Sequence, residues 1–182
     1  MLKLQKQKKD NKMALSKSLY INGMQCPKLL WLSKHRKGDE SVYLGDIDTS
    51  LIADMSSLFE PDVCGAWAER EDFSGIESWN VSNVRDMSLM FHNCHFFNAD
   101  ISGWNVSSCE SFYKMFGNCY LFNQPLGKWN TSKVRDVRYM FSMCASFKGD
   151  LNSWDISNLK ETYGMFGGCN CTVPSWYNKM KG

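Results

Sequence analysis

The sequence lacks the long apolar run that a membrane-spanning helix needs. No stretch of about 18 apolar residues occurs in the chain, so we expect no membrane span. The lysine-rich start, Met1 to Lys12, is followed by no apolar segment or small-residue cleavage site, so we predict no secretory signal. The location stays open, and the chain as written is expected in the cytoplasm.

Proline and excess charge are also scarce. The 182 residues include 4 prolines, with 43% hydrophobic and 22% charged residues, and the net charge is only +2. This composition is typical of one folded domain and not of a disordered chain. Residues 1–40 hold ten Lys or Arg against three acidic residues, while residues 41–182 hold eleven against sixteen. We therefore predict a basic flexible tail over residues 1–15 and expect no nucleic-acid partner.

Catalytic and metal-binding patterns are missing as well. The three histidines, His35, His92 and His95, have no partner at a spacing typical of catalysis. No Gly-x-Ser-x-Gly turn is present, no Cys-x-x-Cys spacing occurs, and Cys169 and Cys171 form a lone Cys-x-Cys from which no zinc site follows. The sequence thus predicts no catalytic residue, no cofactor and no metal, and the protein is not expected to be an enzyme.

An internal repeat is the dominant feature that is present. Four copies align tryptophan, phenylalanine and cysteine in three columns. The columns are Trp79, Trp104, Trp129 and Trp154; Phe91, Phe116, Phe141 and Phe166; Cys94, Cys119, Cys144 and Cys169. A weaker fifth copy begins near Ile47, at a longer offset from the next copy than the others have. A fixed period of about 25 residues is typical of a stacked repeat protein.

Each unit shows two kinds of spacing. Val84, Met87, Phe91 and Cys94 follow a helical spacing after a serine that could cap a helix of about ten residues. The segment that ends at Trp104 is expected to form a short parallel strand. We therefore predict an α/β solenoid, a leucine-rich-repeat-like right-handed coil of about five strand-helix units over residues 44–176.

The cysteine and tryptophan columns allow two interpretations each. The cysteines could bind metal or form disulfides, but one cysteine in each repeat spreads the sulfurs along an axis, which favours small buried thiols. Without an export signal the thiols should be reduced. The tryptophans could stack on a carbohydrate, but repetition beside Ile101, Leu126 and Leu151 favours a buried core column.

Two segments resemble known families. The run from Phe97 to Ser107, continued by Met115 to Cys119, resembles the repeat of BspA-like leucine-rich-repeat surface proteins, as found in mycoplasmas. The resemblance implies a non-enzymatic module that binds proteins or host molecules, as in adhesion. Gly23 to Leu32, which contains Cys26, resembles the start of RecB-like PD-(D/E)XK nucleases. We interpret residues 16–43 as a helical N-terminal cap derived from such a nuclease.

The most informative variable positions form a row on successive repeats. Tyr113, Arg138 and Tyr163 hold the same position in three consecutive copies and are residue types that often dominate binding energy at protein interfaces. We therefore predict a protein-interaction module whose partner is a protein or a host surface ligand. The alternatives are a remnant metal-dependent nuclease and a fusion fragment without a function of its own. The sequence does not determine the oligomeric state.

Overall fold

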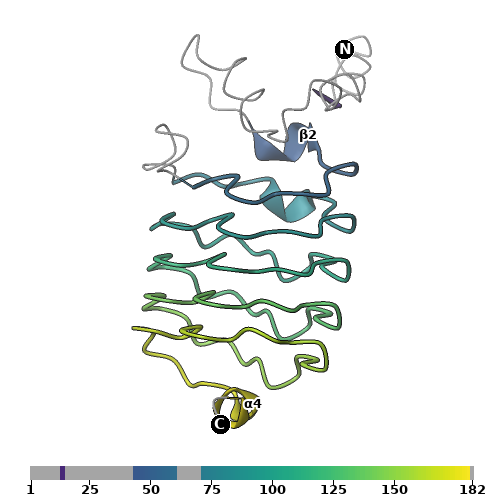
Figure 1. Ribbon diagram of the computed structural model, residues 1–182. Coiled ribbons are helices and arrows are strands. Elements are labelled where there is room, and N and C mark those ends of the chain that lie inside the picture. The colour runs from purple at the N-terminus through teal and green to yellow at the C-terminus, as the bar shows by residue number, and fades with distance from the viewer. Residues whose placement is uncertain (1–12, 15–42, 61–70, 181–182) are drawn as a thin grey trace, which may run out of the picture.

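The computed structural model describes residues 13–14, 43–60 and 71–180. In these ranges the repeats lie one above another along a single axis, with the C-terminal helix at one end (Figure 1). The regular elements are β1 (Met13–Ala14), the 3₁₀ helix η2 (Leu44–Asp46), β2 (Ile47–Asp48), the 3₁₀ helix η3 (Ile76–Ser78) and α4 (Ser175–Lys179). Strands β1 and β2 pair in parallel, with Met13 opposite Ile47. The predicted N-terminal cap over residues 16–43 lies outside the described residues, apart from Tyr43.

The prediction of an α/β solenoid built from strand-helix units is wrong. Between residues 79 and 174 the chain contains no helix and no strand, only turns and isolated parallel bridges. The helix expected after each repeat serine is absent, so the leucine-rich-repeat assignment has no support. The bridges link one position in each repeat to the next. They are Asp54 to Asp86, Asp86 to Ser111, Ser111 to Asp136, and Asp136 to Glu161.

Left-handed backbone conformations explain why no helix forms. Leu89 has a φ of 60° and Asn93 a φ of 63°, whereas an α-helix needs a negative φ at every residue. The same two positions are left-handed in the later repeats. They are Lys114 and Asn118, Tyr139 and Met143, and Gly164 and Gly168. The chain therefore bends twice in a segment where the apolar spacing alone predicted one continuous helix.

Backbone hydrogen bonds run between the repeats. The amide of Met87 donates to the carbonyl of Ser111 at 3.1 Å, and that of Leu89 donates to Tyr113 at 2.7 Å. Amides at intervening positions close short turns, as Met90 does by donating to Met87 at 3.2 Å. Each repeat thus satisfies its neighbour's backbone groups, which takes the place of the bonds within a helix.

The repeat serines also differ from the predicted helix caps. The amide of Ser107 donates to the side-chain oxygen Oδ1 of Asn105 at 3.2 Å, and Ser132 donates to Asn130 in the same way at 3.1 Å. These contacts are Asx turns, in which an asparagine or aspartate side chain bonds the backbone two residues on. The Asn-x-Ser sequence therefore encodes a turn.

Tryptophan side chains form one buried column of the core. Trp104 and Trp129 are each 4% exposed, and their indole Nε1 atoms donate to the carbonyls of Ile76 at 3.1 Å and Ile101 at 3.2 Å. Trp176 of α4 extends this column, because its Nε1 donates to the carbonyl of Leu151 at 2.9 Å. The short helix thus closes the C-terminal end of the tryptophan column.

Phenylalanine rings fill the other half of the core. Phe116 is fully buried and stacks on Phe91 and Phe141, with ring centres 5.8 and 5.6 Å away. A second column lies beside the first and was not identified from the sequence. Its members are Phe97, Phe122 and Phe147, whose rings stack at 3.8, 4.1 and 4.2 Å on the first-column rings of their own repeats.

The left-handed conformation at Leu89 can be tested by two substitutions. We expect Leu89→Gly to raise the free energy of unfolding by about 0.5–1 kcal/mol, because glycine adopts a positive φ without the steric cost paid by leucine. Leu89→Val should lower it, because a β-branched side chain fits this conformation poorly. Urea denaturation measures both. A loss of stability for the glycine variant would instead agree with a helical residue, where glycine costs about 1 kcal/mol.

Candidate interaction surface

The predicted row of Tyr113, Arg138 and Tyr163 lies at the surface of three successive repeats. The guanidinium carbon of Arg138 lies 5.2 Å from the ring centre of Tyr113, a distance suited to a cation–π contact. Tyr163 is 71% exposed and packs edge-to-face against Tyr139, with ring centres 5.4 Å apart. The structure thus brings Tyr113 and Arg138 into contact. Tyr163 contacts Tyr139, which lies beside them.

Tyr139 and Lys114 belong to the same surface and were missed from the sequence. The Nζ atom of Lys114 lies 5.5 Å from the ring centres of both Tyr113 and Tyr139, and these two rings meet edge-to-face at 6.4 Å. Both residues occupy the repeat position directly after the predicted row. We call Tyr113, Lys114, Arg138, Tyr139 and Tyr163 the tyrosine surface.

An ion pair fixes the arginine of this surface. Nη2 of Arg138 donates to Oδ2 of Asp136 at 2.6 Å, and Nε donates to Oδ1 at 3.0 Å. These hydrogen bonds raise the pKa of Arg138. The paired geometry limits rotation of the guanidinium, so the cation is held beside the Tyr113 ring.

The repeated cysteines are placed for packing. The thiols of Cys94, Cys119 and Cys144 are buried, and each donates from Sγ to a phenylalanine carbonyl, at 3.2, 3.0 and 2.8 Å respectively. Burial raises the pKa of Cys144 to about 12, and that of Cys119 well above its usual value. A thiol that resists ionisation is a poor nucleophile and a poor metal ligand.

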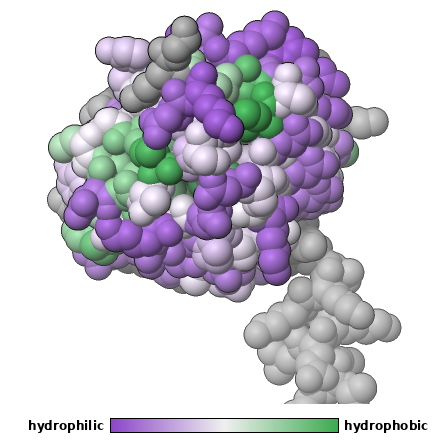
Figure 2. Space-filling view, turned by 90° about the horizontal axis from the view of Figure 1, so that it is seen from below, coloured by the Kyte–Doolittle hydropathy of each residue, from purple (hydrophilic) through white to green (hydrophobic). Residues whose placement is uncertain are grey.

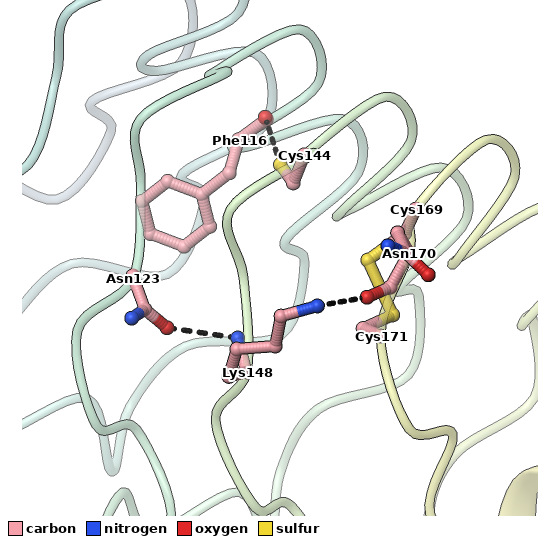
Figure 3. Close-up of a disulfide and its surroundings, with 7 residues drawn as sticks. All are labelled: Phe116, Asn123, Cys144, Lys148, Cys169, Asn170 and Cys171. Atoms are coloured by element: carbon pink, nitrogen blue, oxygen red, sulfur yellow. Dashed lines mark hydrogen bonds between the residues drawn. A yellow bond between two sulfur atoms is a disulfide. The ribbon is translucent and has the colours of Figure 1, made fainter.

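Cys169 departs from this pattern. It forms a disulfide with Cys171 (Figure 3), and both residues are only half-buried. The expectation that all thiols are reduced is therefore wrong for this pair. The sequence did show the Cys-x-Cys spacing, but repeat alignment assigned Cys169 to the buried column.

The two histidines that the structure describes, His92 and His95, each contact a neighbouring side chain. His92 Nδ1 lies 3.1 Å from Glu60 Oε1, and the Ser57 hydroxyl donates to Glu60 Oε2 at 2.6 Å. The carboxylate therefore stands between the hydroxyl and the imidazole, whereas a catalytic serine bonds the imidazole directly. His95 stacks on Tyr120 at 4.7 Å. In the part of the chain that the structure describes, no three metal-ligating side chains come together.

Raised thiol pKa values predict a fall in stability at alkaline pH. Burial holds the pKa of Cys109 and Cys144 at about 12 in the folded protein, against 9.0 for an ordinary thiol. As the pH rises from 9 towards 12, the unfolded chain loses protons that the folded chain keeps, so the stability present below pH 9 is lost. The Cys144→Val variant should show a shallower decline than wild type by about 1.4 kcal/mol per pH unit. Urea denaturation at a series of pH values measures this, and parallel curves would contradict it.

The end of the molecule that carries α4 is mixed in polarity. Figure 2 views the molecule from this end and shows separate apolar areas among hydrophilic groups. Across the described ranges, the helices are too short or too polar to cross a bilayer.

Comparison with known proteins agrees with the repeat pattern. The family model described as "Mycoplasma protein of unknown function, DUF285" matches residues 61–176, which is well over half of the chain. No curated protein and no solved structure matches the chain. The matched range excludes the N-terminal segment, so the nuclease resemblance gains no support. The repeats, their buried aromatic columns and this match together establish that the chain belongs to the DUF285 family.

Proposed function

We propose that this protein is a non-catalytic binding module that contacts a protein partner through its tyrosine surface. The observation that carries the proposal is the cluster of three tyrosine rings with two cations beside them. Tyrosine and arginine are enriched among residues that dominate interface energies. Adhesion to a host or cell surface is the form of binding that the BspA-like resemblance implies.

A rigid backbone supports this role. The amide of Lys114 donates to the carbonyl of Arg138 at 2.9 Å, and that of Tyr139 donates to Tyr163 at 3.1 Å. These bonds link the three repeats in the backbone that carries the tyrosine surface, in which Tyr163 is exposed and the other four residues are half-buried. A surface that is already ordered loses little conformational entropy when a partner binds, so a modest number of aromatic contacts suffices.

The buried groups support the non-catalytic part of the proposal. The repeated thiols of Cys119 and Cys144 are buried in the core and have raised pKa values, and the repeat serines lie in Asx turns, as at Ser107. The repeated residues serve packing and turn formation. The chemical variety between repeats lies mainly at the surface.

Site-specific crosslinking tests the proposal. A photoreactive amino acid replaces Tyr163 in cells of the source organism, and a matched variant carries it at Tyr120, which is also exposed, at 42%. We expect a discrete protein adduct from position 163 and none from position 120. The captured partner is then purified and titrated with wild-type protein and variants.

The affinity measurement decides the outcome. Tyr163→Ala and Arg138→Ala should each weaken binding by roughly tenfold or more, as interface hot spots do, while Tyr120→Ala should leave it unchanged. Equal effects at Tyr120 and Tyr163, or no effect at either, would show that the partner binds elsewhere.

A further inference from the structure

The two half-buried cysteines differ chemically from every other cysteine that the structure describes. Cys94, Cys109, Cys119 and Cys144 have buried thiols, whereas Cys169 and Cys171 are bonded to each other, with their Cα atoms 5.4 Å apart. We propose that the Cys169–Cys171 pair is a dithiol–disulfide exchange site, at which a dithiol reductant and this protein trade a disulfide. The proposal is independent of the proposed function.

The position of the pair makes the sulfurs accessible. Cys171 occupies the repeat position held by Phe96 and Leu121, which are 48% and 50% exposed. Residue 170, between the two cysteines, is exposed. Both cysteines are half-buried against the edge of the core, so part of the pair faces solvent, whereas Cys94, Cys119 and Cys144 are each at most 3% exposed.

Lys148 provides a positive charge beside the pair. Its side-chain ammonium donates a hydrogen bond to the carbonyl oxygen of Asn170, and its backbone amide donates to Oδ1 of Asn123 at 2.8 Å (Figure 3). Among the described residues no carboxylate forms an ion pair with this ammonium. A neighbouring cation stabilises a thiolate, so Lys148 favours the reactive form of the reduced cysteines.

The bond can open without unfolding the protein. It joins residues only two positions apart, so it closes a very short loop and restricts the unfolded chain little. The aromatic columns that hold the repeats together do not depend on it. Reduction is therefore a local event, as repeated exchange requires.

The exchange proceeds in two balanced steps. A thiolate of the dithiol reductant attacks one sulfur of the pair, the Cys169–Cys171 bond breaks, and a mixed disulfide forms while the other cysteine leaves as a thiolate and takes a proton. The second thiol of the reductant, as its thiolate, then attacks the reductant sulfur of the mixed disulfide, and the protein cysteine bonded there leaves as a thiolate and takes a proton. The reductant departs as a disulfide, and the two cysteines have gained two electrons and two protons.

Site-resolved alkylation of the native full-length chain tests this step. Oxidised protein is treated with dithiothreitol, then with iodoacetamide, and each cysteine is quantified by mass spectrometry. We expect Cys169 and Cys171 to become labelled together, and Cys144 to remain unlabelled until the protein is denatured. A pair that is already free in the oxidised protein would overturn the proposal. So would labelling of Cys144 at the same dithiothreitol concentration, because reduction would then open the fold.

A lysine variant tests the contribution of the charge. Lys148→Gln should slow alkylation of the reduced pair by roughly threefold to tenfold at pH 7, because more of each thiol stays protonated. The difference should vanish at pH 10, where the thiols ionise in both proteins. Lys128→Gln removes an exposed lysine elsewhere and should match wild type at both pH values. If Lys148→Gln also matches wild type at pH 7, the assignment of an activated exchange site is wrong.

Discussion

Replacing Trp129 by alanine is expected to lower the free energy of unfolding by about 3–5 kcal/mol. The indole is 4% exposed, and its ring centre lies 5.4 Å from that of Phe112. Its Nε1 donates to the buried carbonyl of Ile101 at 3.2 Å. The substitution therefore leaves a cavity and also an acceptor without its donor, and each of these adds to the loss. Urea denaturation followed by far-UV circular dichroism measures the change.

Trp129→Phe is the matched control for the hydrogen bond. Phenylalanine keeps much of the buried ring and removes only the donor, so it should destabilise less than alanine and more than a surface change. Near-normal unfolding of Trp129→Ala would contradict the buried position. It would instead favour the alternative in which the tryptophan column is an exposed platform for carbohydrate.

The repeat could be predicted from the sequence because its columns are chemically distinctive. Tryptophan and phenylalanine recur at exact intervals, and large aromatic side chains in register imply stacking along one axis. Burial of Trp104 and Trp129 at 4% exposure agrees with that reasoning. The contribution of Trp176 was not evident, because it follows Trp154 too closely to fall in the register of the other tryptophans.

The conformation of each repeat could not be predicted in the same way. Val84, Met87, Phe91 and Cys94 point into the core at helical spacing, yet the backbone between them turns through left-handed residues. A leucine at position 89 does not indicate a left-handed conformation, because leucine rarely adopts a positive φ. Backbone bonds between repeats stabilise the conformation, and a pattern within one repeat carries no information about them.

The tyrosine surface shows the same limit. Variation between copies identified Tyr113, Arg138 and Tyr163. Tyr139 and Lys114 occupy the next repeat position, which on the predicted helix would point about 100° away from that row. In the turn-rich backbone both positions reach the same surface. The contacts of Tyr139 and Lys114 with the predicted row therefore follow from the backbone conformation and not from the repeat pattern.

Replacing Phe116 by alanine is expected to lower the free energy of unfolding by about 3–5 kcal/mol. The ring is buried on all sides, so its removal leaves a cavity that the surrounding side chains fill only in part. Phe116 is fully buried and stacks on Phe91, Phe122 and Phe141 at 5.8, 4.1 and 5.6 Å. Two of these rings belong to the repeats on either side. The loss should therefore weaken the coupling between neighbouring repeats as well as the repeat that carries the substitution.

Hydrogen exchange distinguishes lost coupling from a uniform loss of stability. In Phe116→Ala the amides of Phe91 and Phe116, which bond to Met115 and Met140, should exchange faster than amides near α4, because opening starts at the cavity. Phe96→Ala makes the same chemical change at a side chain that is 48% exposed, and it should alter stability by no more than about 0.5 kcal/mol. Equal losses for the two variants would mean that the phenylalanine column does not hold the repeats together. Faster exchange spread evenly over all repeats would mean that they unfold as one unit and not through their nearest neighbours.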